Sequence, residues 1–249
     1  KIKSHKWPDM KTCVDKFDVR EYVRRKGLGD ILIPLVTEEK AYQSSSEIDF
    51  NALPKKFVAK DTLGGGGNSV FVCTNKEDLN TDEFKRTLDE WVKVSGVHPG
   101  REHVYEGKKH RIIVEQYLEP NHIELGLVDY KFFCFNGIPK YMYVITNREL
   151  GKKAEFGIYD ADFNLLDVQI ADELPVLHKV KKPIRFEEMK QIACVLSRDF
   201  PEVRVDLYNH DGKIYFGELT FFNFSGYFRY IPDEFDYTIG DEFPITSLV

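Results

Sequence analysis

Four consecutive glycines separate two apolar segments in FVAKDTLGGGGNSVFV, residues 57–72. Glycine costs backbone entropy in a folded chain, so such a run is favoured where the backbone must flex or approach a ligand closely. Backbone N–H groups in such a loop can bind phosphate oxygens, and Lys60 adds a positive charge beside it. The loop is neither a Walker A motif nor a Gly-x-Gly-x-x-Gly motif. It therefore predicts either a phosphate-binding lid or a flexible hairpin tip.

Two carboxylates lie on VRVDLYNHDGKIYFGELTFFN, residues 203–223, which predicts two strands around a turn at 209–212. A hairpin loop of odd length would place Asp206 and Glu218 on one face. Buried carboxylates are costly unless they are paired or bound to a cation, and two of them with nucleotide phosphates are a common Mg²⁺ site. Arg204 shares the strand face of Asp206 and could bind a carboxylate or a phosphoryl group. An Arg204–Glu218 ion pair on an exposed sheet is the alternative.

A third candidate is the triplet Asp160-Ala161-Asp162. An Asp-x-Asp pair can hold a metal ion on a nucleotide-sugar diphosphate, which is glycosyltransferase chemistry. Aspartate between two apolar strands also favours a turn, and the turn is the preferred interpretation. Nucleophilic catalysis by serine or cysteine is disfavoured, because the chain has no Gly-x-Ser-x-Gly elbow and no cysteine with a local signature of activation.

Apolar periodicity predicts the elements that position these residues. Helices are expected at 14–26, from Thr81 onward, and at 186–200. Strands are expected at 31–36, 56–60, 69–73, 111–117, 129–135, 139–147, 155–160, 164–170, 203–208 and 213–219, the first an unlikely central strand because of Pro34. Asn136–Gly137 predicts a hairpin turn. Short helices among antiparallel strands indicate the α+β class.

Net charge and cysteine content indicate which partners and which cellular compartment the sequence favours. The 249 residues include 35 Lys and Arg against 41 Asp and Glu, a net charge of −6, which argues against a nucleic-acid partner. No apolar run approaches the roughly 20 residues that span a bilayer, and no signal segment opens the chain. The four cysteines lie about 60 residues apart without a Cys-x-x-Cys pair. Reduced thiols in a cytoplasmic protein are expected.

Five segments are most specific in this order of features: DKFDVREYV (15–23), LPKKFVAK (53–60), IIVEQYLE (112–119), DYKFFCFNGIPKY (129–141) and DFPEVRVDLYNHDGKIYFGELTF (199–221). Their order resembles the ATP-grasp superfamily, in which two α+β lobes clamp ATP. The chain is more closely similar to the TupA-like ATP-grasp family, which is linked to teichuronopeptide, capsule and lipopolysaccharide assembly. The resemblance implies a leading segment at 1–50, a small ATP-binding lobe at 51–118, and a larger lobe at 119–249 that carries the metal and acceptor site.

The resemblance also implies how the chain would bind ATP. Lysines on the leading segment and on the first strand would contact the phosphates, the glycine loop would close over them, and the hinge between the lobes would meet adenine. The residues in these positions are Lys16, Lys60, Gly64, Gly65, Gly66, Gly67, Glu115, Gln116 and Leu118.

The same resemblance implies roles at the metal site. Asp206 and Glu218 match the two Mg²⁺ ligands, and Arg204 matches the arginine beside the transferred phosphoryl group. Lys131 falls where related ligases place a basic residue near the acyl-phosphate. The family's Glu-x-Asn triplet is Glu-Leu-Thr here, so the third metal ligand stays open among Thr220, Asn223 and water.

The implied function is an ATP-dependent carboxylate–amine ligase that forms an amide through an acyl-phosphate, with ATP and Mg²⁺ as cofactors. Its substrates would be an amino acid or amine and a sugar acid of a bacterial surface polysaccharide, with peripheral contact to a membrane-bound assembly system. The alternatives are a nucleotide-sugar-dependent glycosyltransferase using Asp160 and Asp162, and a non-catalytic nucleotide-binding ATP-grasp module, which Thr220 favours. The oligomeric state is left open. The aromatic cluster at 221–230 is either an acceptor-sugar platform or, preferably, core and subunit contact.

Overall fold

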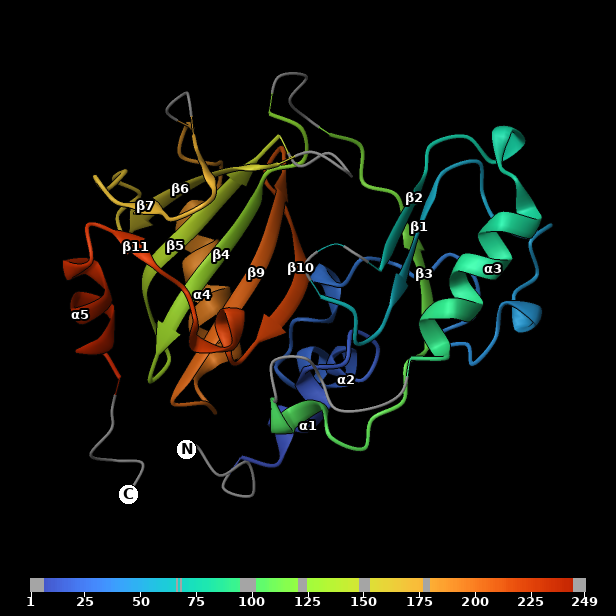
Figure 1. The fold of residues 1–249 in the computed structure, drawn as a ribbon, viewed down its shortest axis with the longest axis horizontal. Helices are drawn as coiled ribbons and strands as arrows, with labels where there is room; N and C mark the ends of the chain where they lie inside the picture. Colours follow the sequence, from blue (N-terminus) through green and yellow to red (C-terminus); the bar gives the residue numbers. More distant parts are fainter. Residues whose placement is uncertain are drawn as a thin grey trace.

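A six-stranded sheet, a three-stranded sheet, a small two-stranded sheet and the helices packed on them organise the described residues (Figure 1). The computed structural model describes residues 7–65, 67, 69–94, 102–120, 125–147, 153–176 and 180–243. The helices and strands in chain order are α1 (Asp9–Cys13), α2 (Val19–Arg25), β1 (Phe57–Asp61), β2 (Val70–Cys73), α3 (Thr81–Val92), β3 (Ile112–Gln116), β4 (Asp129–Phe135), β5 (Ile138–Thr146), β6 (Glu155–Asp160), β7 (Gln169–Ile170), β8 (Leu174–Pro175), α4 (Phe186–Ser197), β9 (Glu202–His210), β10 (Lys213–Thr220), β11 (Tyr230–Ile231) and α5 (Glu234–Gly240).

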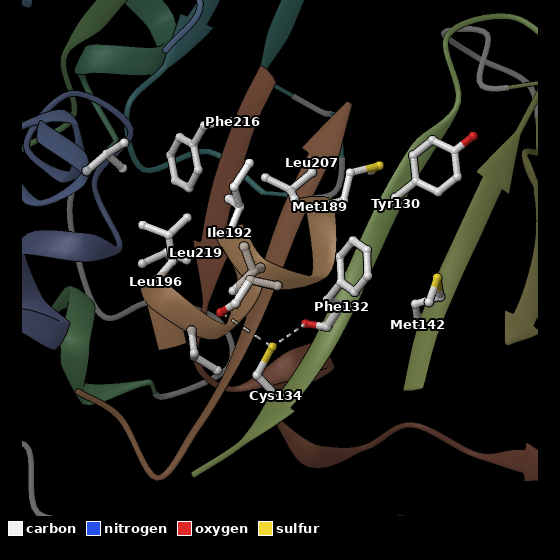
Figure 2. Close-up of a cluster of buried hydrophobic side chains, with 14 of the residues drawn as sticks. Tyr130, Phe132, Cys134, Met142, Met189, Ile192, Leu196, Leu207, Phe216 and Leu219 are labelled. Atoms are coloured by element: carbon white, nitrogen blue, oxygen red, sulfur yellow. Dashed lines mark hydrogen bonds between the residues drawn. The ribbon is translucent and has the colours of Figure 1, made fainter. Parts of the chain in front are cut away.

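The larger sheet has the strand order β10-β9-β4-β5-β6-β8. Its neighbouring strands are antiparallel except β6 and β8. Alternate residues of β9, β4 and β5 face α4, because side chains alternate across a strand. Figure 2 shows this layer, in which Phe132 and Leu207 from the sheet meet Ile192 and Leu196 from α4. The burial fixes which face of β4 and β9 is left for polar side chains.

The opposite face of the larger sheet is covered in part by the C-terminal segment. Phe133, Tyr143 and Ile158 form a second cluster there with Tyr230 of β11 and Phe235 of α5. In Figure 1, β11 and α5 lie over the end of the sheet away from β9 and β10. The polar half of this face therefore lies beside a packed aromatic half.

The smaller sheet has the order β2-β1-β3, with antiparallel pairing. Helix α3 packs Phe84, Leu88 and Trp91 against it, the three residues expected on its apolar side. Asn80 caps α3 by accepting from the N–H of Glu83. Side chains on the other face of this sheet, such as Lys60, are left to meet the rest of the molecule.

The N-terminal segment contacts both sheets. Met10, Val19 and Tyr22 belong to the core of the larger sheet, whereas Tyr42 and Ile48 belong to the core of the smaller one. The leading segment at 1–50 thus contributes to two cores, and we keep the division into 1–50, 51–118 and 119–249 as a prediction.

The helix expected at 14–26 is confirmed only in its second half, as α2, because residues 14–18 form a turn after α1. Between them, Asp15 Oδ1 accepts from the N–H groups of Phe17 and Asp18 at 2.9 and 3.0 Å. A short polar side chain that bonds its own backbone competes with helical hydrogen bonds. The expected stop at Gly27 is confirmed, since its φ of 75° suits glycine.

Two expected strands differ from the structure. The segment 31–36 forms only isolated bridges, from Leu32 to Phe216 and from Leu35 to Glu115. Of 164–170, only Gln169–Ile170 is a strand, and it pairs with β11. The other expected strands and the Asn136–Gly137 turn are confirmed. The α+β class is likewise confirmed, and all four cysteines are free. No helix in the described part of the chain is long and apolar enough to cross a membrane.

Candidate functional site

A β-bulge brings the two predicted metal ligands opposite each other. From the turn at Asp211–Gly212 the register runs regularly to the pair Leu207–Phe216, and Gly217 is then the extra residue. Beyond it Asp206 pairs with Glu218. Because directly paired residues share a face, both carboxylates lie on the face away from α4. The expectation that they share a face is confirmed, although the cause is the bulge and not the loop length.

Arg204 is the centre of this face. Its Nε and Nη2 donate to Asp206 Oδ1 and Oδ2 at 2.7 and 2.8 Å. Nη2 also donates to Glu218 Oε1 at 3.1 Å and to Thr220 Oγ1 at 2.9 Å. Nη1 donates to Asn223 Oδ1. The guanidinium therefore gathers four oxygen-bearing side chains around one point.

Lys131 reaches the same point from β4, where it pairs in register with Asp206. Its ammonium contacts Asp206 Oδ2 and lies 2.8 Å from Asp129 Oδ2. Asp129 is 1% exposed and was not singled out from the sequence. It lies two residues from Lys131 on one strand, so the i, i+2 spacing of opposite charges was the available signal. Lys131 is thus held between two buried carboxylates.

Lys16 comes to the site from the turn between α1 and α2. Its ammonium donates to the carbonyl oxygen of Gly64 and lies 3.7 Å from Glu218 Oε2. Its backbone N–H donates to Thr62 O at 2.8 Å. The early lysine thus joins the glycine loop to the carboxylate pair.

Asp15 holds the turn that carries Lys16, and sequence reasoning missed it. Asp15 is 1% exposed, and its Oδ2 accepts from Arg111 Nη2 at 2.9 Å. Arg111 also donates to Asp18 Oδ1 at 2.7 Å. Arg111 directly precedes β3, so this pair connects the turn to the smaller sheet.

Lys60 and Glu115 form a second cluster on the smaller sheet. Lys60 Nζ lies 2.6 Å from Glu115 Oε2, and both side chains are at most 15% exposed. Leu118 packs with Ile33 of the leading segment and with Tyr215 of β10, so the expected hinge touches the larger sheet. Gln116 is exposed, and its N–H donates to Pro34 O at 2.9 Å. This N–H is therefore engaged within the protein.

The glycine run connects β1 and β2 beside Lys16. A side chain at Gly64 would bring its Cβ within 2.6 Å of Ser69 Cβ, whereas Gly65 has nothing within 4 Å. Gly67 has a φ of 81°. Gly66 lies outside the described residues. Close packing therefore requires glycine at the neck of the loop, and open space surrounds the next position.

Burial and neighbouring charges shift the pKa values of two glutamates at the site. Burial alone would raise the pKa of Glu218, but Lys16, Lys131 and Arg204 outweigh it and hold that pKa well below its usual value. Glu218 is therefore ionised at neutral pH. Nearby on β9, burial raises the pKa of Glu202 to about 8, against a lowering by Arg204.

The donor set fits a hard divalent cation. Within the described residues, no group of three or more His, Cys, Asp or Glu side chains could hold a metal ion. Asp206 and Glu218 would therefore need further oxygen ligands, and Thr220, Asn223 and nucleotide phosphates are oxygen donors. Mg²⁺ takes one or two carboxylates together with phosphate and water oxygens, so these residues suit it.

Asp160 and Asp162 form a turn, as preferred from the sequence. Asp160 accepts from the N–H groups of Asp162 and Asn164 and from the Asn164 side chain, at 2.8–2.9 Å. The Asp162 side chain is 83% exposed. The aromatic cluster is divided: Phe221 is in the core, whereas Tyr227 is 84% exposed.

Two solved structures of one ligase, one of them complexed with ATP, have a similar fold. D-alanine–D-alanine ligase from Bacillus anthracis matches at a TM-score of 0.51 and 16% identity, over 84% of this chain and 57% of that one. The same enzyme complexed with ATP matches at a TM-score of 0.50 and 15% identity, over 84% and 55%. The chain spans a little over half the length of these ligases, and at this identity the likeness shows the fold alone.

Comparison of the sequence with protein families is more specific than the likeness of fold. No curated protein matches it. The TupA-like ATP-grasp family does match, over residues 1–244. This range includes both sheets, the glycine run and the Arg204 cluster. The fold is accordingly the ATP-grasp fold of the α+β class, and the chain belongs to the TupA-like ATP-grasp family.

Proposed function

We propose that this protein is an ATP-dependent carboxylate–amine ligase. One observation carries the proposal: Arg204, Lys131 and Lys16 converge on the facing carboxylates Asp206 and Glu218. The cations lie among three carboxylates, Asp129 included, so the cluster offers basic groups for nucleotide phosphates and carboxylates for a divalent cation. Membership of an ATP-grasp family supports ATP as the nucleotide.

The proposed reaction has two steps. A carboxylate oxygen of the acid substrate attacks the γ-phosphorus of ATP, and the bond to the β-phosphate oxygen breaks, which releases ADP. The amine nitrogen then attacks the acyl carbon of the acyl-phosphate, inorganic phosphate leaves, and the amine loses a proton. The product is an amide.

The protein's own residues would bind the phosphates and stabilise developing charge. Lys16 and Lys60 would contact phosphate oxygens, Arg204 would lie beside the transferred phosphoryl group, and Lys131 would stay near the acyl-phosphate. Asp206 and Glu218 would hold Mg²⁺, which when bound neutralises charge on the phosphates. The loop at 64–67 would close over the nucleotide and exclude water from the acyl-phosphate.

The finer proposal concerns adenine and the acceptor. Glu115, Gln116 and Leu118 would meet adenine at the hinge, with the Gln116 N–H excluded because it bonds Pro34. The acid would be a sugar acid of a bacterial surface polysaccharide and the amine an amino acid or small amine, as the family resemblance suggests. The enzyme would then act in the cytoplasm and contact a membrane-bound assembly system peripherally.

The test combines binding and turnover. ATP with Mg²⁺ should raise the unfolding midpoint of the wild type, because a ligand that binds only the folded state stabilises it. Glu218→Gln, at a side chain 32% exposed, should lose most of that shift and at least about 100-fold in ADP release with an acid and amine panel, as for loss of a transition-state charge partner. Asp162→Asn is the matched control. Wild-type ADP release by Glu218→Gln would overturn the metal assignment, and a midpoint shift with UDP-sugars alone, lost in Asp162→Asn, would favour a glycosyltransferase.

A further inference from the structure

Glu202 is a buried carboxyl group that the proposed reaction does not use. It begins β9, is 8% exposed, and shares a strand face with Arg204, two residues further along the chain. Arg204 directs its hydrogen bonds to four other side chains. Within the described residues, no hydrogen bond or ion pair engages the Glu202 carboxyl group. Burying a polar group without a partner costs free energy, so the position suits a partner that arrives with a ligand.

The surroundings of Glu202 keep the carboxyl group uncharged in the free protein. It pairs in register with Phe135 of β4, which belongs to the aromatic cluster of that face. The titratable groups that interact with it electrostatically are Arg204 on β9, Cys134 on β4 and Tyr230 on β11. Only Arg204 favours the carboxylate, so burial prevails and raises the pKa of Glu202 to about 8. The group can therefore change its charge near neutral pH when a cation binds beside it.

The site face of β9 runs from the hinge toward Glu202. Tyr208 packs at the hinge end, in the cluster that contains Leu118. Asp206, the proposed metal ligand, comes next, and Arg204 follows beside the proposed position of the transferred phosphoryl group. Alternate residues of a strand are about 7 Å apart, so Glu202 lies one such step beyond Arg204. With adenine at the hinge, Glu202 is on the side of the phosphoryl group where the acceptor must approach.

We propose that Glu202 binds the ammonium group of the amine substrate and accepts its proton before the nitrogen attacks the acyl-phosphate. The inference rests on the proposed function, and it restricts the amine to one that is protonated at neutral pH, such as an amino acid. An ammonium group beside a carboxyl group favours the charged carboxylate. Glu202 therefore releases its own proton to water as the amine binds.

The proton transfers then balance. The carboxylate takes one proton from the ammonium group, and the lone pair that this frees attacks the acyl carbon. As the bond from the acyl carbon to the phosphate oxygen breaks, a second proton leaves the nitrogen with the phosphate, and the third stays on the amide. A base with a pKa near the working pH is well suited to such a transfer.

The first measurement follows the titration of the Glu202 carboxyl carbon by NMR, with Mg²⁺ and a non-hydrolysable ATP analogue present. The signal is assigned by its absence in Glu202→Gln. Ethylammonium chloride should move the titration midpoint about 1–3 pH units lower, as an opposite charge at contact distance does. Tetramethylammonium chloride, a cation without an N–H donor, is the matched control and should leave the midpoint unchanged. An unchanged midpoint with ethylammonium would overturn the inference.

The second measurement separates the amine step from phosphoryl transfer. Hydroxylamine is largely uncharged at neutral pH and traps an acyl-phosphate as a hydroxamate without a base. Glu202→Gln should therefore keep the wild-type midpoint shift with ATP and Mg²⁺, and wild-type hydroxamate formation from glucuronic or galacturonic acid. Amide formation from the same acids with glycine or alanine should fall at least about 100-fold, the lower end for loss of a general base.

Glu90→Gln, an exposed position on α3, is the matched control and should keep both activities. Equal loss of hydroxamate and amide formation in Glu202→Gln, or loss of neither, would show that Glu202 does not serve the amine. A wild type that forms no ADP and shows no midpoint shift with ATP and Mg²⁺ would instead refute the proposed function. In that case the titration with ethylammonium would still decide whether Glu202 binds an ammonium group.

Discussion

Arg204 contacts four oxygen-bearing side chains because a guanidinium presents five N–H donors in a fixed plane. Asp206 takes two of its hydrogen bonds in a bidentate arrangement, which is the strongest geometry for this pair. An ammonium group at this position has only three donors and no planar fork. Arg204 therefore fixes the positions of the Asp206 and Glu218 carboxylates relative to each other.

Glu202 should lower the free energy of unfolding as the pH rises. Its folded pKa of about 8 lies above the ordinary glutamate value near 4.3, because burial disfavours the charge. The folded state therefore holds a proton that the unfolded state releases, so the contribution is complete below the unfolded pKa and is lost as pH rises through about 8. Glu202→Gln should remove this loss, on the order of a few kcal/mol of unfolding free energy.

The measurement is denaturant unfolding of both proteins from pH 5 to 9. The wild type should lose unfolding free energy relative to Glu202→Gln across that range. Glu90→Gln, an exposed position on α3, is the control and should follow the wild type. Parallel curves for wild type and Glu202→Gln would show that Glu202 is not protonated in the folded state.

At the scale of elements, sequence periodicity predicted β1, β2, β4, β5, β9, β10 and α3 well. Each is regular over several residues and has one face or both in a core, so the apolar pattern is set by burial. The segment 164–170 looked equally apolar, but Asp160 bonds Asn164 and directs the chain into a turn. Local hydrogen bonds between a side chain and the backbone leave no periodic pattern in the sequence, so periodicity cannot predict the turn.

Much of the candidate site followed from residue types and the family resemblance, but its geometry did not. Asp206 and Glu218 were predicted to share a face. The bulge at Gly217 could not be predicted from the sequence, because a glycine within a strand can mark a bulge, a bend or a close approach of another backbone. Asp129 and Tyr143 were missed since both lie within regular apolar strands. Asp129 joins the Arg204 cluster through Lys131 only after β4 pairs with β9, and Tyr143 lies opposite Lys131 only after β5 pairs with β4.

Gly217→Ala tests whether the bulge positions Glu218. A Cβ at this position would lie 3.1 Å from Asp206 O and 3.4 Å from Asp206 Cβ, so β10 must shift against β9. We expect a loss of about 1–2 kcal/mol in unfolding free energy, typical of overpacking, and a larger proportional loss in ADP formation.

Gly240→Ala is the matched control for this variant, because nothing lies within 4 Å of a Cβ there. It should retain wild-type ADP formation and stability. If Gly217→Ala kept full ADP formation while losing stability, the bulge would matter for packing and not for placing the carboxylates.

At the scale of the molecule, the turn at 15–18 connects parts that pack in different cores. The helices on either side of it belong to the core of the larger sheet, whereas Arg111 and Thr62 belong to the smaller-sheet side. Arg111 to Asp15, together with Lys16 to Thr62, ties the two sheets beside the proposed nucleotide site. A ligand that contacts both sheets binds well only if the two parts of its site keep a fixed relative position, and these bonds provide it.

Arg111→Gln should loosen this tie without touching the carboxylate pair. It leaves Asp15 Oδ2 buried and without its charged donor, at a cost on the order of 1–3 kcal/mol. Because Asp15 holds the turn that aims Lys16, the KM for ATP should rise about fivefold to tenfold, within the range of a misplaced binding group, while kcat falls less. Steady-state ADP formation gives both constants, and hydrogen exchange at the Phe17 and Asp18 amides reports on the turn. Arg86→Gln, exposed on α3, should change neither, and an unchanged KM in Arg111→Gln with faster exchange at the turn would show that the tie serves stability alone.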